Sequence, residues 1–158
     1  MTITDLASFA PASAAPVGEP SNLGVVGLPT NLVAAASVHV RDGTLFGAPL
    51  RARFTPVGFD FDYGDGSAAA LRTGGATWEA LGRAQFTPTT TSHVYRERGT
   101  YDVRVTVRYT AEIDPGTGWI PLDGELAVAG PPRSIRILEA HTGLVGYTCE
   151  ERPSGPGC

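Results

Sequence analysis

Three aspartates, Asp60, Asp62 and Asp65, lie close together in the stretch 58–66. Carboxylates at this density supply the hard oxygen ligands that Ca²⁺ prefers, so one hypothesis is a calcium site. In the alternative, Asp62 and Asp65 accept backbone N–H groups inside a Gly-Asp-Gly turn, as short polar side chains do in Asx turns. Both readings stay open on the sequence, and we expect no cofactor other than this possible Ca²⁺.

The three histidines, His39, His93 and His141, are far apart in the chain and show no metal-ligand spacing. A Ser-His-Asp triad can be assembled from distant residues, but the Gly-x-Ser-x-Gly elbow of the hydrolases is absent from the sequence. We expect His93 to be structural, bonded to a strand or turn near the rim of the fold. The sequence therefore predicts that the protein is not an enzyme.

Trp78 and Trp119 both lie on stretches that depart from a regular strand pattern, where binding residues tend to occur. An exposed tryptophan can stack on a sugar ring or anchor a protein partner. The alternative is that Trp78 plugs one end of the fold and Trp119 packs across a hairpin. The exposure of these two side chains decides between a binding and a structural role.

Cys149 and Cys158 are the only cysteines. A bridge between them would enclose only the polar stretch 150–157, so little of its stabilisation would reach a core. The even count near the terminus favours a disulfide and an oxidising compartment, and two reduced thiols are the alternative. The CxxC spacing of redox and zinc sites is absent.

The composition favours an all-β chain, because 20 Gly and 13 Pro recur between short apolar runs and predict many turns. The net charge is −4 and no basic stripe is present, which argues against a nucleic-acid partner. No apolar run approaches the ~20 residues that span a bilayer. Residues 1–15 lack the features of a signal peptide, so either the protein stays inside the cell or Met1 begins a mature form.

Alternating apolar residues predict the strands that position these side chains. A hairpin over 32–54 is expected to turn at Asp42-Gly43, because this dipeptide accepts the positive φ angles of a tight turn. The longest strand begins at Tyr101 and continues to about Ile113, a partner strand covers 119–128, and a last strand runs near 133–145. The inward-facing residues of the return strand and the next strand are predicted to be Phe46, Ala48, Leu50, Ala52, Phe54, Val57, Phe59, Phe61 and Tyr63.

Two segments fall outside this pattern. Residues 1–22 are rich in Pro and Ala and are expected to form a strap or linker. Residues 67–92 form a long insertion, with one helical turn predicted over 77–82 and a short strand over 85–87. A loop of this length inside a domain usually has a function.

Three blocks of sequence carry a resemblance to a known family. They are Phe-Asp-Phe-Asp-Tyr-Gly-Asp-Gly-Ser (59–67), Ser-His-Val-Tyr (92–95) and Gly-Thr-Tyr-Asp-Val-Arg-Val-Thr-Val (99–107). In this order they resemble the PKD (polycystic kidney disease) domain, and the whole frame resembles small secreted PKD proteins of high-GC Gram-positive bacteria. Phe61 stands where the family usually has Trp, and the stretch 68–91 is longer than in a minimal domain.

The resemblance implies an immunoglobulin-like antiparallel β-sandwich over 23–146. The tail over 147–158 is expected to carry the disulfide that the cysteine count favours. The resemblance also implies an extracellular or cell-surface location. The expected function is a secreted, non-catalytic module for protein–protein interaction, adhesion or spacing, with self-association by strand edges as one possible mode. The alternative is a glycan-binding module that uses Trp78 or Trp119.

Overall fold

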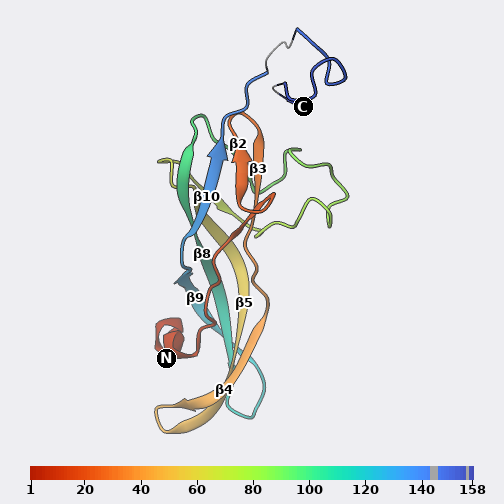
Figure 1. Ribbon diagram of the computed structural model, residues 1–158. Helices are drawn as coiled ribbons and strands as arrows, with labels where there is room; N and C mark the ends of the chain where they lie inside the picture. The colour runs from red at the N-terminus through yellow and green to blue at the C-terminus, as the bar shows by residue number, and fades with distance from the viewer. Residues whose placement is uncertain (143–145, 156) are drawn as a thin grey trace.

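Two long antiparallel strands, β5 (Ala48–Asp62) and β8 (Gly99–Asp114), form the spine of an elongated all-β fold (Figure 1). The computed structural model describes residues 1–142, 146–155 and 157–158. The two strands pair from Arg51 opposite Asp114 to Asp62 opposite Arg104, with a bulge between Pro56 and Gly58. The alternation predicted for β8 is confirmed, and its buried side chains are Val103, Val105, Val107, Tyr109, Ala111 and Ile113.

The remaining strands of the large sheet divide it into two halves. β4 and β9 flank the spine in the lower half of Figure 1, and β6 and β10 flank it in the upper half. β2 joins the upper half by pairing with β10 in parallel, the one departure from the predicted antiparallel order among the described strands. The bounds are β2 (Leu23–Val25), β4 (His39–Leu45), β6 (Ala68–Leu71), β9 (Ile120–Ala129) and β10 (Arg133–Leu138).

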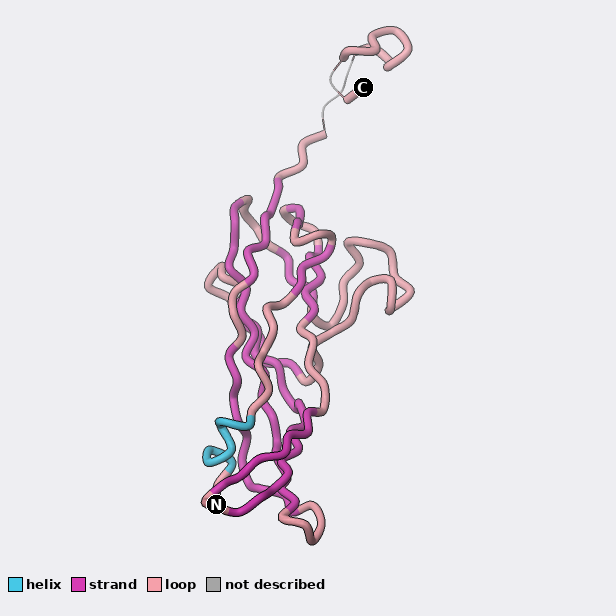
Figure 2. Tube along the Cα trace, turned by 60° about the horizontal axis from the view of Figure 1, so that its bottom comes forward, coloured by secondary structure: helices cyan, strands magenta, loops and turns pink. Residues whose placement is uncertain are grey.

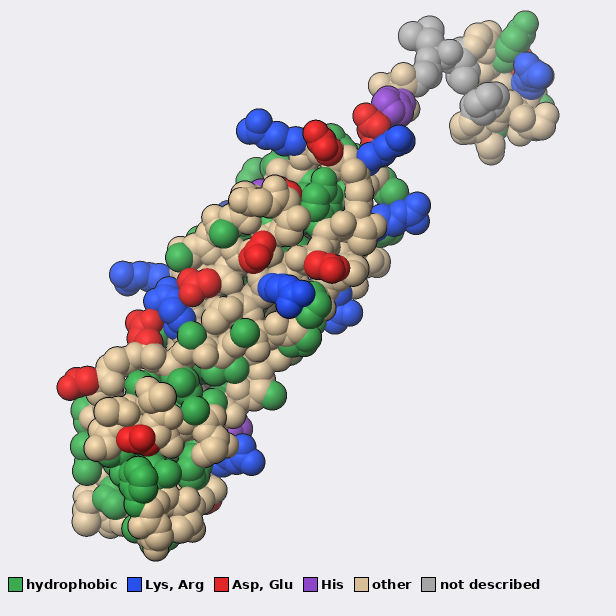
Figure 3. Space-filling model, turned by 90° about the vertical axis from the view of Figure 1, so that its left-hand side faces the viewer, with side chains coloured by type: hydrophobic (Ala, Val, Ile, Leu, Met, Phe, Trp, Pro, Cys, Tyr) green, Lys and Arg blue, Asp and Glu red, His purple; other side chains and the backbone are tan. Residues whose placement is uncertain are grey.

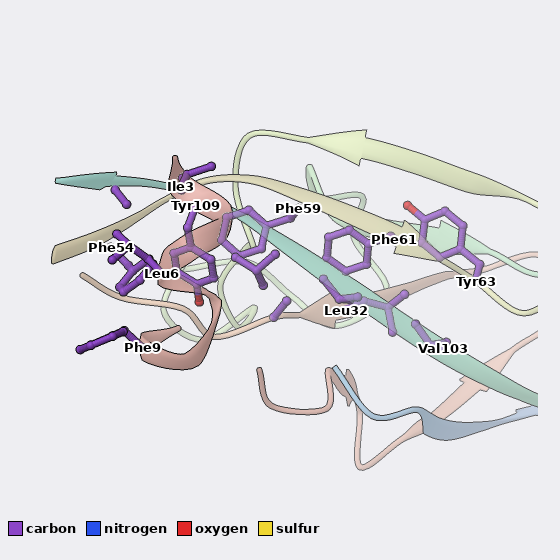
Figure 4. Close-up of a cluster of buried hydrophobic side chains, with 14 of the residues drawn as sticks. Ile3, Leu6, Phe9, Leu32, Phe54, Phe59, Phe61, Tyr63, Val103 and Tyr109 are labelled. Carbon is purple, nitrogen blue, oxygen red and sulfur yellow. The ribbon is translucent and has the colours of Figure 1, made fainter. Parts of the chain in front are cut away.

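Different elements cover the inner face of this sheet at its two ends. A three-stranded sheet of β1 (Val17–Glu19), β3 (Pro29–Val33) and β7 (Ser92–Val94) lies over the upper half, which makes that half sandwich-like. The 3₁₀ helix η1 (Ile3–Phe9) lies at the lower end, beside β9 (Figure 2). The core is continuous between them, as Figure 4 shows for side chains of η1, β5 and β8.

The first hairpin differs from its prediction in the position of the turn. The chain reverses at Phe46-Gly47, where φ is 51° and 79°, and Asp42-Gly43 continues within β4. A side chain at Gly43 would collide with the ring of Phe9, so this glycine serves the close packing of η1 on the strand. The prediction that Phe46 and Ala48 face inward is wrong, because both are exposed at the hairpin end.

The two irregular segments are more ordered than their composition indicates. In the N-terminal strap, the helix η1 buries Ile3, Leu6 and Phe9. The insertion begins with β6 and contains the predicted turn at 77–82, where the Ala80 N–H donates to Thr77 Oγ1 over 3.1 Å. The strand predicted over 85–87 does not form, and Phe86 has a φ of 62°. The last strand ends at Leu138, and 143–145 lie outside the described residues.

The surface of the body is mixed in charge. Acidic and basic side chains alternate along the face seen in Figure 3, and hydrophobic side chains gather near its lower end. No helix in the described part of the chain is long and apolar enough to cross a membrane.

Candidate functional site

The Gly64-Asp65-Gly66 turn is held by its own aspartates. The Gly64 N–H donates to Asp62 Oδ1 over 3.0 Å, and the Ser67 N–H donates to Asp65 Oδ1 over 3.0 Å. Gly64 has a φ of 77°, and a Cβ there would lie 2.8 Å from the Asp102 carbonyl oxygen of β8. These contacts are those of the Asx-turn alternative.

His93 joins this turn to the small sheet. Its Nε2 lies 2.7 Å from Asp65 Oδ2 and 3.3 Å from Ser67 Oγ, so a Ser, a His and an Asp do meet. In a catalytic triad the two partners use different ring nitrogens, so that the histidine can pass a proton from one side to the other. Here the same nitrogen contacts both partners, and Asp65 also accepts a hydrogen bond from the Ser67 hydroxyl. The cluster therefore closes the turn and does not form a nucleophilic triad.

Aromatic rings bury the inner side of the cluster. The imidazole of His93 stacks on Tyr63 with ring centroids 3.9 Å apart, and Tyr95 meets it edge-on at 4.7 Å. The Tyr95 hydroxyl donates to the Tyr63 carbonyl oxygen over 3.0 Å, and burial raises the pKa of Tyr95 and of Tyr63. Partial burial alone would raise the pKa of Asp65, but the hydrogen bonds from Ser67 and His93 outweigh it and lower this pKa to about 2.

The three aspartates do not converge on one point. Asp60 lies on the outer face of the sheet, where Arg108 Nε is 3.1 Å from its Oδ2 and Arg108 Nη1 is 2.8 Å from Glu125 Oε2. Asp62 and Asp65 are occupied by the turn. Within the described residues, no group of three or more His, Cys, Asp or Glu side chains is placed to hold a metal ion. The calcium hypothesis thus lacks a ligand cage.

Trp78 is a structural residue of the insertion. It is only 3% exposed, and its indole N–H donates to the Thr87 carbonyl oxygen over 2.9 Å, so the segment folds around the ring. In this position the ring is not available to stack on a sugar.

A buried polar network ties the same insertion to the small sheet. Asn31 Nδ2 donates to Glu19 Oε2 over 2.6 Å and to the Ala76 carbonyl oxygen over 2.9 Å. Asn31 Oδ1 accepts a hydrogen bond from the Thr89 hydroxyl over 2.6 Å. Glu19 Oε2 also accepts a hydrogen bond from the backbone N–H of Trp78. The network uses donors and acceptors that are far apart in the sequence, so it could not be read from spacing.

Trp119 is half-buried at the lower end of the sheet. The guanidinium carbons of Arg53 and Arg51 lie 4.2 and 5.5 Å from its ring centroid, which is cation–π geometry. Arg53 is held in turn by Glu112, with 2.6 Å between Nη2 and Oε2. These two arginines occupy the ring face on which a ligand would stack.

Cys149 and Cys158 form the predicted disulfide, with Cα atoms 5.4 Å apart. It lies in the C-terminal tail, which projects away from the body of the fold (Figures 1 and 2). The bridge closes a loop in the tail and connects no two strands.

The feature that the sequence analysis missed is the tip of the β4–β5 hairpin. Phe46 is 75% exposed there and has a φ of 51°, a left-handed conformation that costs an ordinary residue roughly 1–2 kcal/mol. Because β8 pairs with β5 only from Arg51 onward, the last residues of the hairpin project as a two-stranded ribbon. The signal in the sequence is Phe-Gly at a turn that normally selects Asn-Gly.

Comparisons with family models, with curated proteins and with solved structures found no match for this chain. The all-β, sandwich-like fold and the disulfide stand on the structure, and the likeness to PKD domains rests on the three sequence blocks alone.

Proposed function

We propose that this chain is a non-catalytic, extracellular protein-interaction module whose contact surface is the tip of the β4–β5 hairpin. The observation that carries the proposal is Phe46, a large apolar side chain held out in water at a strained backbone position. Folding gains nothing from either property, whereas a binding anchor needs a large aromatic side chain presented on a firm support.

The support is the long sheet behind the tip. β4 pairs with β5 along its whole length, and Phe9 of η1 packs on Gly43, so the ribbon is fixed at its base. Val40 and Ile120 are also exposed apolar residues of this lower half. Both lie about five to six residues from the tip along the strands, roughly 17–20 Å away, so the contact at the tip rests on Phe46 itself.

The free edges of the sheet are less suited to the contact than the tip. Arg41 on β4 faces the inner side of the sheet, and β9 carries Pro121 and Asp123. Inward-facing charges and prolines on edge strands are devices that discourage strand addition. We therefore place the contact at the tip and not along an edge.

The compartment and the PKD-like character are part of the same proposal. The terminal disulfide is compatible with an oxidising, extracellular environment. The glycan alternative has lost its main residues, because Trp78 is buried and Trp119 lies under two arginines.

Sedimentation velocity over a concentration series tests the contact with a second copy as the first partner. We expect a dimer or larger species at high concentration in the wild type and none in Phe46→Asn, which keeps the turn and removes the aromatic ring. Leu81→Asn, which alters another exposed apolar residue in the insertion, is the matched control and should associate as the wild type does.

Association that persists unchanged in Phe46→Asn would contradict the proposal. A wild type that stays monomeric at every concentration would exclude self-association and leave contact with a different protein.

A further inference from the structure

A hollow of about 790 Å³ lies on the inner side of the large sheet, beside β4. It is lined by the strap at Ala10 to Ala12, by the β3–β4 connection from Val33 to Ser37, and by the loop from Arg72 to Gly75. The small sheet covers the upper half of the inner face and η1 the lower half, so the hollow lies where the two covers meet.

The inner side of the hollow is apolar. Phe59 of β5 and Tyr109 of β8 line it, and both are at least nine-tenths buried in the fold. One wall carries only the small methyl side chains of Ala34, Ala35 and Ala36, which leave the space beside them unfilled. A hollow of this size, apolar in part and with a few polar groups, has the form of a small-molecule site.

Two polar side chains of β4 face this floor. His39 and Arg41 are paired in register with Phe54 and Ala52, both buried, and residues opposite one another in a sheet share a face. Both side chains therefore point to the inner side. The Nε2 atom of His39 is buried and has no hydrogen-bond partner in the described part of the chain.

The charge of the hollow is one-sided. Arg41 and Arg72 line it, and no carboxylate is among its described lining residues. In the described residues the arginines that form ion pairs are Arg51, Arg53 and Arg108, all with partners elsewhere. Two guanidinium groups with no ion-pair partner among the described residues form a cationic site in a protein of net charge −4.

We propose that this hollow binds a small organic carboxylate, with Arg41 and Arg72 on the carboxylate and with Phe59 and Tyr109 against the body of the ligand. A guanidinium fork matches a carboxylate in geometry as well as in charge. Tyr109 adds a phenol that stays protonated, because burial raises its pKa. The carboxylate can belong to an aryl acid or to a uronic acid of a glycan, and the test separates these two sources.

NMR titration of the labelled full chain with phenylacetate and with galacturonate provides the test, and phenylacetamide and galactose serve as the neutral counterparts. We expect at least one acid to shift the signals of His39, Phe59 and Tyr109 in a saturable way, and its neutral counterpart to bind at least about fivefold more weakly. Saturation by phenylacetate alone assigns the site to aryl acids, and saturation by galacturonate alone assigns it to acidic glycans.

Substitutions then locate the site. Arg41→Gln and Arg72→Gln should each weaken binding about five- to tenfold, because each removes one charge-assisted contact from an exposed side chain. Ala35→Phe should abolish binding by filling the hollow without changing its charge. Arg104→Gln, an exposed arginine on the opposite face of the sheet, should leave binding unchanged.

Absence of saturable shifts with both acids would overturn the proposal. Equal binding of an acid and its neutral counterpart, or equal weakening by Arg104→Gln, would also overturn it, because binding would then not depend on this pair of arginines. The titration does not involve the hairpin tip, so its outcome is independent of the association experiment.

Discussion

The two halves of the large sheet are built on the same pair of strands but are finished differently. The upper half is covered by a second sheet, and its Gly-rich turn is closed by Asp62, Asp65 and His93. The lower half is covered by one short helix and ends in a ribbon that carries an exposed Phe46. The strands β5 and β8 run through both halves and connect them.

The two halves differ in what their unusual residues do. In the upper half the recognisable motifs serve the backbone: the aspartates hold a turn, and Trp78 fills its own loop. In the lower half the unusual feature is Phe46, a strained and exposed aromatic residue whose contacts among the described residues show no structural use. The recognisable motifs therefore lie in the part of the molecule that stabilises the fold. The residue that breaks a local backbone preference lies at the proposed contact surface.

The largest expected effects come from the core of each half, which Leu32→Ala and Leu6→Ala compare. Both leucines are fully buried, so each truncation should cost about 2–5 kcal/mol of unfolding free energy. We expect Leu32→Ala to cost more, because a strand between two others cannot collapse onto the cavity as a terminal 3₁₀ helix can. Denaturant unfolding measures the difference.

Hydrogen exchange of the same two variants sharpens the comparison. Leu6→Ala should speed exchange in β4 and β9 and leave β10 protected. Equal acceleration throughout the chain in both variants would show that the halves open as one unit.

The next effect concerns the buried amide that joins the insertion to the small sheet. Asn31→Ala should cost about 2–3 kcal/mol, because Glu19 and Thr89 lose their buried partner. Limited proteolysis should then cut within 72–91, whereas the wild type resists. Unchanged resistance would mean that Trp78 alone holds the insertion.

The sequence predicted the scaffold better than the surface. Period-two alternation located β8 and both arms of β5, but it predicted these arms as two strands, which a bulge between Pro56 and Gly58 joins into one. The Asx bonds of the Gly64 turn follow from residue type. The position of the first turn was missed, because Asp42-Gly43 is a stronger local turn signal than Phe46-Gly47. A tertiary contact, Phe9 on Gly43, overrides that signal. The groups that line the hollow come from segments that only the fold brings together.

Acid should weaken the upper half through Asp65. Its pKa in the folded protein is about 2, below the usual 3.8, so the ionised carboxylate stabilises the fold above about pH 4. That contribution is lost as the pH falls from about 4 to about 2, and it amounts to roughly 1–2 kcal/mol for this partly exposed group.

Melting curves between pH 7 and pH 2 compare Asp65→Asn with the wild type. The variant should lose less stability on acidification, since it lacks the titrating group. Asp42→Asn, which alters an exposed aspartate of the lower half, is the control. If the melting temperatures of the wild type and of Asp65→Asn fell in parallel with pH, ionised Asp65 would not stabilise the fold.

The smallest effect should come from the terminal disulfide. Joint replacement of Cys149 and Cys158 by Ser should change the melting of the body by less than the ~2.5–3 kcal/mol of the loop-entropy model, because the closed loop lies in the tail. A change of that full size would show that the tail folds with the body.

The proposal that Phe46 serves contact and not the stability of the fold is tested most directly by the unfolding free energy of Phe46→Asn. Asn-Gly suits the positive φ angles of this turn, so the variant should be as stable as the wild type or more stable by up to about 1–2 kcal/mol. The measurement is denaturant unfolding at a concentration where the wild type is monomeric. A loss of more than about 1 kcal/mol would mean that Phe46 serves the fold, and it would contradict the assignment of the hairpin tip to contact.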